Sequence, residues 1–178
     1  MDLSRLIGFF LSLKNRKVII DFVTNTWDKF TDSRLRSLHP DIREAAAGFI
    51  NEVYNDLGIS LRIGSDGHLR TFDEQKRLYD AYIQGSGVKA AAPGASYHNY
   101  GLAMDLYWIK KTSLFDPAKD KLTWLKVVKV GEKYGFTWPL AWADPPHFQN
   151  TFGYSWQNLL SKYQNNDMVN GYVNLGIV

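Results

Sequence analysis

An alternating segment from Gly101 to Leu106 constrains the fold of this chain more than any other. Leu102, Met104 and Leu106 are large and apolar, whereas a glycine, an alanine and Asp105 stand between them. Side chains alternate between the two faces of a β-strand, so the pattern predicts a strand with one face in a core. The small residues leave space on the other face, and Asp105 lies beside that space, where a carboxylate can bind an ion.

His98 is the first candidate partner for this carboxylate. It precedes Asp105 by seven positions, and an unbroken strand would place the two side chains on opposite faces. Residues 99–101 must therefore bend or bulge, which the glycine at 101 permits. Taken alone, each residue is better explained structurally, as a half-buried histidine and an acid at the end of a strand.

A second segment changes this balance, because Asp144 and His147 flank two consecutive prolines. The prolines exclude a helix. In an extended polyproline geometry the Cα atoms of Asp144 and His147 would lie about 9 Å apart, with both side chains projecting to similar sides. His147 can then bind a metal while Asp144 reaches a water on that metal.

Two histidines and one carboxylate match a catalytic zinc site, in which a tetrahedral ion keeps its fourth position open. Zinc lowers the pKa of a bound water and polarises a carbonyl. A nearby carboxylate takes the proton and passes it to the leaving amine. The sequence therefore predicts an amide hydrolase with His98, Asp105 and His147 as zinc ligands and Asp144 as general base.

These residues carry a family resemblance. The motif S-x-H-x-x-G-x-A-x-D from Ser96 to Asp105, followed by D-x-P-H-F from Asp144 to Phe148, resembles the M15 family of zinc peptidases. That family includes D-Ala-D-Ala carboxypeptidases, VanX-like dipeptidases and the L-alanyl-D-glutamate endopeptidases of bacteriophage endolysins. The similarity covers residues 34–149 and matches every fixed position of the first motif.

The resemblance implies the same ligand set and the same base, and an aspartate at position 144 is closer to the endopeptidase branch. Arg70 matches an arginine that the family places near the substrate, where a guanidinium stabilises a carboxylate or a developing oxyanion. A salt bridge beside a helix start explains Arg70 equally well. Ser96 either binds substrate or closes a turn. Glu74 and Gln75 are better explained by capping and a surface position.

Capping residues and periodicity place the remaining elements. We expect helices over residues 40–57, 72–84, 121–134 and 155–163, and strands over residues 18–23 and 59–63. The fold class is then α+β, with a small antiparallel sheet that carries the metal motifs and helices packed on one face, as in Hedgehog domains and DD-peptidases. With 178 residues the chain fits one domain. We divide it into a helical or mixed lead-in (1–33), the catalytic domain (34–150) and an extension packed on it (151–178).

Composition excludes several classes. The absence of cysteine excludes disulfides and thiolate metal sites. The net charge of +3 is scattered, which argues against a nucleic-acid partner. The apolar run Leu6–Leu13 is too short to span a membrane, and no signal peptide is recognisable. We expect a monomer that is made in the cytoplasm and acts on the cell wall after release through a pore formed by another protein.

Three alternatives remain open. The ligand set also describes the facial triad of non-haem Fe(II) oxygenases, but the seven-residue gap and Asp144 favour the hydrolase. A zinc-retaining binding domain of the same fold would not need Asp144. Within the family, the predicted reaction is cleavage of the L-Ala-D-Glu bond in the peptidoglycan stem peptide, and the alternative is a D,D-carboxypeptidase or dipeptidase.

Overall fold

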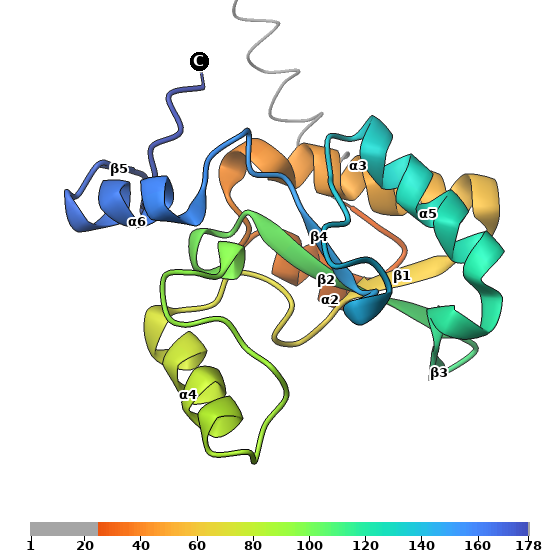
Figure 1. Cartoon of the computed structure of the whole chain (residues 1–178). Helices are drawn as coiled ribbons and strands as arrows, with labels where there is room; N and C mark the ends of the chain where they lie inside the picture. Colours follow the sequence, from red (N-terminus) through yellow and green to blue (C-terminus); the bar gives the residue numbers. More distant parts are fainter. Residues whose placement is uncertain (1–24, 178) are drawn as a thin grey trace, which may run out of the picture.

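The computed structural model describes residues 25–177, and the strand expected over residues 18–23 lies outside this range. The described chain folds into a small antiparallel sheet with helices packed on one face (Figure 1), which confirms the expected α+β class. Between residues 25 and 177, no helix combines the length and the apolar character that a membrane crossing requires.

The central strand of the sheet is β2 (Ala103–Lys110), the strand that the alternating pattern predicted. It pairs antiparallel with β1 (Ser60–Ile63), β3 (Ser113–Phe115) and, near its beginning, β4 (His147–Gln149). Each residue of these three strands that pairs with a residue of β2 therefore projects its side chain to the same face of the sheet as that residue.

Residues 25–177 form five α-helices beside the sheet, namely α2 (Lys29–Leu35), α3 (Pro40–Leu57), α4 (Phe72–Ile83), α5 (Lys121–Lys133) and α6 (Trp156–Gln164). Short 3-10 helices lie at η1 (Tyr97–Tyr100), η2 (Pro117–Asp120) and η3 (Ala141–Ala143), and β5 (Met168–Val169) pairs with β6 (Tyr172–Val173). The helices and the strand expected within residues 40–163 begin and end within one residue of these bounds. The capping box of α4 is present as expected, with Thr71 and Glu74 bonded reciprocally.

The core lies between the sheet and the helices α3 and α5, which lie side by side above the sheet in Figure 1. Phe49 of α3 meets Phe148 of β4 edge-to-face at 5.2 Å between ring centroids. A Cβ at Gly131 of α5 would lie 2.9 Å from the Phe49 ring, so glycine allows this helix to pack close. Met104 and Leu106 are fully buried on this face, and the opposite face of β2 therefore carries Asp105.

The described parts of the two flanking segments, residues 25–33 and 151–177, pack on this body. Leu159 of α6 and Val173 of β6, which follow residue 150, are buried in the core. The ring of His39 is buried and bonds the Val173 carbonyl at 2.9 Å, so this histidine is structural. Helix α2 spans the boundary that we placed between residues 33 and 34, and it contacts β1.

Gly101 makes the bend that was expected between His98 and Asp105. Its φ is +67°, and an added Cβ would lie 2.7 Å from the backbone nitrogen of His39. We expect Gly101→Ala to lower the free energy of unfolding by more than the ~1–2 kcal/mol that a left-handed residue costs, measured by urea unfolding. Gly58→Ala is the control, because Gly58 has φ +66° and no atom within 4 Å of its added Cβ. Equal losses in the two variants would contradict this assignment.

Candidate metal centre

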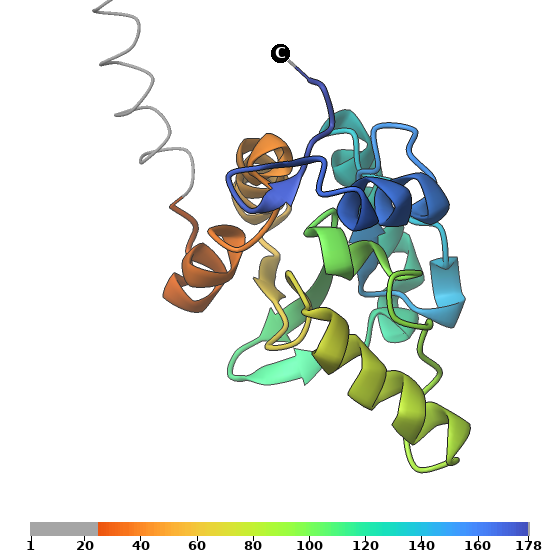
Figure 2. The same cartoon turned by 90° about the vertical axis from the view of Figure 1, so that its left-hand side faces the viewer.

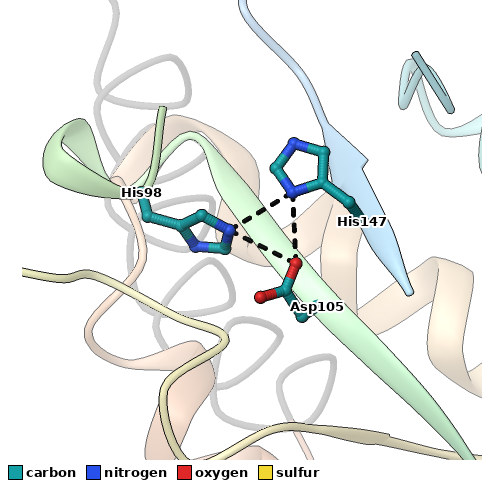
Figure 3. A group of neighbouring side chains, drawn as sticks. All are labelled: His98, Asp105 and His147. Carbon is teal, nitrogen blue, oxygen red and sulfur yellow. Dashed lines mark hydrogen bonds and ion pairs between the residues drawn. The ribbon is translucent and has the colours of Figure 1, made fainter. Parts of the chain in front are cut away.

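Three side chains from separate elements converge at the beginning of β2 (Figure 3). His98 comes from η1, Asp105 from β2 and His147 from β4. Nε2 of His98 lies 3.3 Å from Asp105 Oδ1 and 3.3 Å from His147 Nδ1, and His147 Nδ1 lies 3.1 Å from the same carboxylate oxygen. The sequence predicted these same three residues as metal ligands.

Local backbone geometry explains how these residues meet. The turn of η1 and the left-handed Gly101 carry the chain from His98 into β2. The antiparallel register then pairs Asp105 directly with His147. Directly opposed residues of neighbouring strands project their side chains to the same face, so the acid and the second histidine are brought together by strand pairing alone.

The outer nitrogens of both imidazoles are already occupied. Nδ1 of His98 lies 3.0 Å from the carbonyl oxygen of His68, and Nε2 of His147 lies 3.0 Å from Oε1 of Gln149. A carbonyl only accepts, so each ring donates its outer N–H when neutral, with the Gln149 amide oriented to accept. The inner nitrogens then present lone pairs to each other and to the Asp105 carboxylate, an arrangement that calls for a cation.

The geometry fits zinc. With zinc–nitrogen and zinc–oxygen distances of about 2.0–2.2 Å, ligand atoms of a tetrahedral ion stand about 3.3 Å apart. The three separations of 3.1 to 3.3 Å match the edges of such a tetrahedron. Three protein ligands leave one vertex open, which distinguishes a catalytic zinc site from a structural one.

The charges at the centre shift the pKa values of its members. Burial raises the pKa of Asp105, but the nearby His98 and the hydrogen bonds from both histidines outweigh burial and hold this pKa well below its usual range. Burial lowers the pKa of His147, yet the hydrogen bond to Asp105 and its charge raise it overall. The Asp105 carboxylate therefore favours the protonated form of His147 in the metal-free centre.

This proton should compete with the metal. Because the folded pKa of His147 is raised above its ordinary value of about 6.5, protonation of His147 in the metal-free protein begins at a higher pH. Metal binding needs the neutral ring and releases this proton. We expect zinc affinity, measured with a competing chelator from about pH 5 to 8, to fall as the pH is lowered through that raised value. A pH-independent affinity would contradict the ligand role of His147.

Asp144 lies in the same groove as the three converging residues but is not part of the cluster. Its pKa is raised by burial and by the neighbouring Asp105 carboxylate. The extended geometry that we expected between Asp144 and His147 is wrong. The His147 N–H donates to the Asp144 carbonyl at 3.2 Å, so Asp144, the two prolines and His147 form a hydrogen-bonded turn. Because the turn shortens the span between the two residues, the expected Cα separation of about 9 Å does not hold.

Arg70 also reaches the groove, on the far side of Asp105. Its Nη2 lies 3.9 Å from Asp105 Oδ2, and its Nη1 donates to Oε1 of Gln75 at 2.8 Å. Its Nε is buried without a hydrogen-bond partner among the described residues. The Arg70 guanidinium therefore forms an ion pair, as the structural explanation predicted. It also carries an N–H donor, at Nε, that has no acceptor among the described residues.

The expectation that Gln75 is a surface residue is wrong. Only 1% of Gln75 is exposed, and its amide bonds both the Arg70 guanidinium and the carbonyl of Ala91. It thus connects the start of α4 to the loop that follows this helix and holds Arg70 in place. Ser96 lines the groove beside His98 and makes no capping hydrogen bond with its side chain.

Gln149 is a residue that sequence reasoning missed. It stands two positions after His147 on β4, so both side chains lie on one face, and strand periodicity could have revealed it. Its amide oxygen fixes the ring orientation of His147. We expect Gln149→Ala to weaken zinc binding about 10- to 100-fold, the usual effect of losing such a support, measured by chelator competition. Gln157→Ala on the exposed side of α6 is the control, and equal affinity in both variants would contradict this role.

The centre opens into a groove of about 900 Å³. The groove is lined by loop residues that follow α4 and by residues 139–140. Helix α4 projects away from the sheet in both views (Figures 1 and 2). Pro139 and Leu140 both line the groove. A groove of this size lies within the range of known ligand-binding clefts.

Known proteins resemble this chain in sequence and in fold. The peptidoglycan L-alanyl-D-glutamate endopeptidase CwlK of Bacillus subtilis (strain 168) is 36% identical over 124 residues, which are 63% of this chain and 72% of that protein. The LD-carboxypeptidase LdcB shares the fold, with a TM-score of 0.50 and 22% identity over 79% of this chain and 72% of that structure. DacB of Streptococcus pneumoniae D39 gives a TM-score of 0.50 at 19% identity, covering 74% of this chain and 73% of that structure.

The family itself is recognised over most of the described chain. Residues 35–157 match the VanY family, described as D-alanyl-D-alanine carboxypeptidase. This range contains both histidines, both acids and the whole of the sheet built on β2. The resemblance inferred from the two motifs is confirmed, and the chain belongs to the VanY family of D-alanyl-D-alanine carboxypeptidases.

Proposed function

We propose that the protein is a zinc-dependent peptidase that hydrolyses the L-Ala-D-Glu amide bond of the peptidoglycan stem peptide in the bacterial wall. The observation that carries this proposal is the set of three ligand atoms spaced like the edges of a tetrahedral zinc site at the base of a groove. The choice of bond rests on the relative that is named for it and on the aspartate at position 144.

The proposed chemistry divides between a metal and the protein. His98, Asp105 and His147 would hold the zinc ion, which when bound would lower the pKa of a water and polarise the substrate carbonyl. The Asp144 carboxylate would accept a proton from the attacking water and deliver it to the leaving amine. A raised pKa suits this shuttle, because a carboxylate with a higher pKa is a stronger base for the first step.

Two further groups act on the substrate. The Arg70 guanidinium, held by Gln75, donates hydrogen bonds to the carbonyl oxygen as negative charge develops on it. Ser96, beside His98 in the groove wall, bonds the substrate backbone. Because these donors are fixed by the fold before the substrate arrives, they need no reorganisation during the reaction.

The test uses purified peptidoglycan and mass spectrometry of the released fragments. The expected products end in L-Ala on one side and begin with D-Glu on the other. A chelator should abolish the release, and zinc should restore it. Restoration only by iron with 2-oxoglutarate would instead support the oxygenase alternative, and zinc binding without any cleavage would support a binding domain.

A D,D-carboxypeptidase is the second candidate, because the matched family is described by that activity. The same spectra decide between the two. Release of a single D-Ala from the end of the stem peptide, with the L-Ala-D-Glu bond intact, would replace the endopeptidase proposal by this one.

A further inference from the structure

The sheet face that carries Asp105 continues beyond the metal centre as one wall of the groove. Tyr107 and Ile109 follow Asp105 at two-residue steps on β2 and line the same groove, whereas Leu106 and Trp108 between them are buried in the core. Each step along the strand advances by about 6.6 Å, roughly the length of two residues of an extended peptide. This face therefore offers successive positions to a substrate that extends from the metal.

The first position beyond the metal is polar. Arg62 of β1 is the Cα partner of Tyr107, so the two side chains project to the same face, and both line the groove. The next position is apolar, where Ile109 pairs with Leu114 of β3, which is 68% exposed. The wall thus changes from hydrogen-bonding to apolar groups with distance from the centre.

Tyr107 is held in place but leaves its hydroxyl available. A Cβ on Gly64 would lie 2.5 Å from the Tyr107 ring, so the ring packs directly against the backbone of that glycine. Within residues 25–177 no hydrogen bond is formed by the Tyr107 hydroxyl, and 37% of the residue is exposed. A phenol at neutral pH is a hydrogen-bond donor.

Two arginines extend this donor surface. Arg62 uses Nε and Nη2 to bind the buried Asp28 carboxylate at 2.8 and 2.9 Å, which leaves its Nη1. Arg34 of α2 donates one Nη1 hydrogen bond to the carbonyl of Ile63, and its Nε and Nη2 have no acceptor in the described part of the chain. Both guanidiniums lie near the ring of Phe30, at 5.9 Å for Arg34 and 5.2 Å for Arg62.

We propose that Tyr107, Arg34 and Arg62 form a subsite that binds a carboxylate of the substrate within two residues of the scissile amide. Hydrogen-bond donors without acceptors on two guanidiniums and a phenol call for an anionic oxygen ligand, and a planar guanidinium suits a carboxylate. This inference deepens the proposed function, because an L-Ala-D-Glu substrate carries a carboxylate beside the bond that is cut. Asp66 also lines the groove, and its charge opposes part of this donor surface.

The test compares two synthetic stem peptides that differ at one group, a free carboxylate or a carboxamide on the residue after the scissile bond. Wild-type protein should prefer the carboxylate peptide about tenfold or more in kcat/KM, since hydrogen bonds to charged groups are worth that factor. Arg34→Gln should reduce this preference toward one without changing zinc content. Tyr107→Phe should weaken it in the same direction and serves as the second variant if Arg34→Gln does not fold. Arg62 is left intact, because its removal would strand the buried Asp28.

Matched controls separate this subsite from general effects. Arg36→Gln removes an exposed charge at the end of α2. Tyr82→Phe removes a hydroxyl from a tyrosine that, like Tyr107, is 37% exposed but lies outside the groove. Both variants should keep the wild-type preference for the carboxylate peptide. A wild-type ratio near one, or a ratio unchanged in Arg34→Gln and Tyr107→Phe, would overturn the subsite. Binding of both peptides to the Asp144→Ala protein gives an independent readout. If wild-type protein cleaves neither peptide but binds the carboxylate form through Arg34, the proposed function fails and the subsite stands.

Discussion

His147→Ala is expected to abolish both zinc binding and peptide hydrolysis. The substitution removes one of three ligand atoms and leaves the Asp105 carboxylate with one histidine neighbour. A general base contributes about 10²- to 10⁴-fold to the rate of hydrolysis. The loss of the metal should lower this rate further, because the metal would supply both the activated water and the polarised carbonyl. Zinc content by elemental analysis and hydrolysis of purified peptidoglycan measure the two losses together.

His39→Ala provides the contrast for this experiment. Both histidines are buried, with 4% of His39 and 9% of His147 exposed, but His39 bonds the carbonyl of Val173 away from the groove. We expect its loss to lower the free energy of unfolding while the purified protein keeps its zinc. A His147→Ala protein that retains stoichiometric zinc and full activity would remove the basis of the proposed mechanism.

Asp144→Ala is expected to lower kcat by about 10²- to 10⁴-fold while zinc content stays unchanged. Asp144 lies in the groove but outside the cluster of three ligand atoms, so its loss should remove proton transfer and leave the metal site intact. Steady-state hydrolysis of a synthetic stem peptide, together with elemental analysis, measures both quantities.

Asp144→Asn keeps the size of the side chain and serves as the conservative companion. It should lose activity to a similar extent, because an amide cannot accept and return the proton. If either variant loses zinc along with activity, Asp144 is a ligand rather than a base. If both retain activity, another group performs the proton transfer.

Much of this fold follows from local signals. The alternation around Asp105 predicted β2 and its buried face, and helix boundaries were marked by capping residues such as Thr71 and by the glycine at 58. These signals are reliable because each depends on backbone hydrogen bonds within a few residues. The convergence of His98 with Asp105 was also predictable, since the intervening glycine permits the required bend.

Other features depended on contacts that no local pattern encodes. Two prolines are compatible both with an extended segment and with a turn, and the hydrogen bond from His147 to the Asp144 carbonyl selected the turn. Gln75 occupies a helix position that looks solvent-exposed in sequence, and only the packing of the loop around Ala91 buries it. The donor wall at Tyr107 depends on the pairing of β1 with β2, which the sequence did not specify.

His147 lies far along the chain from the other two converging side chains, since it follows Asp105 by 42 positions. An ion held among them would act as a crosslink between η1, β2 and the short strand β4. Anything that binds the folded state alone adds to its stability, by about 2.7 kcal/mol when the free ligand stands at a hundred times its dissociation constant. Metal supply would then control how long the protein persists against proteolysis as well as whether it can react, so depletion of the ion would shorten its lifetime.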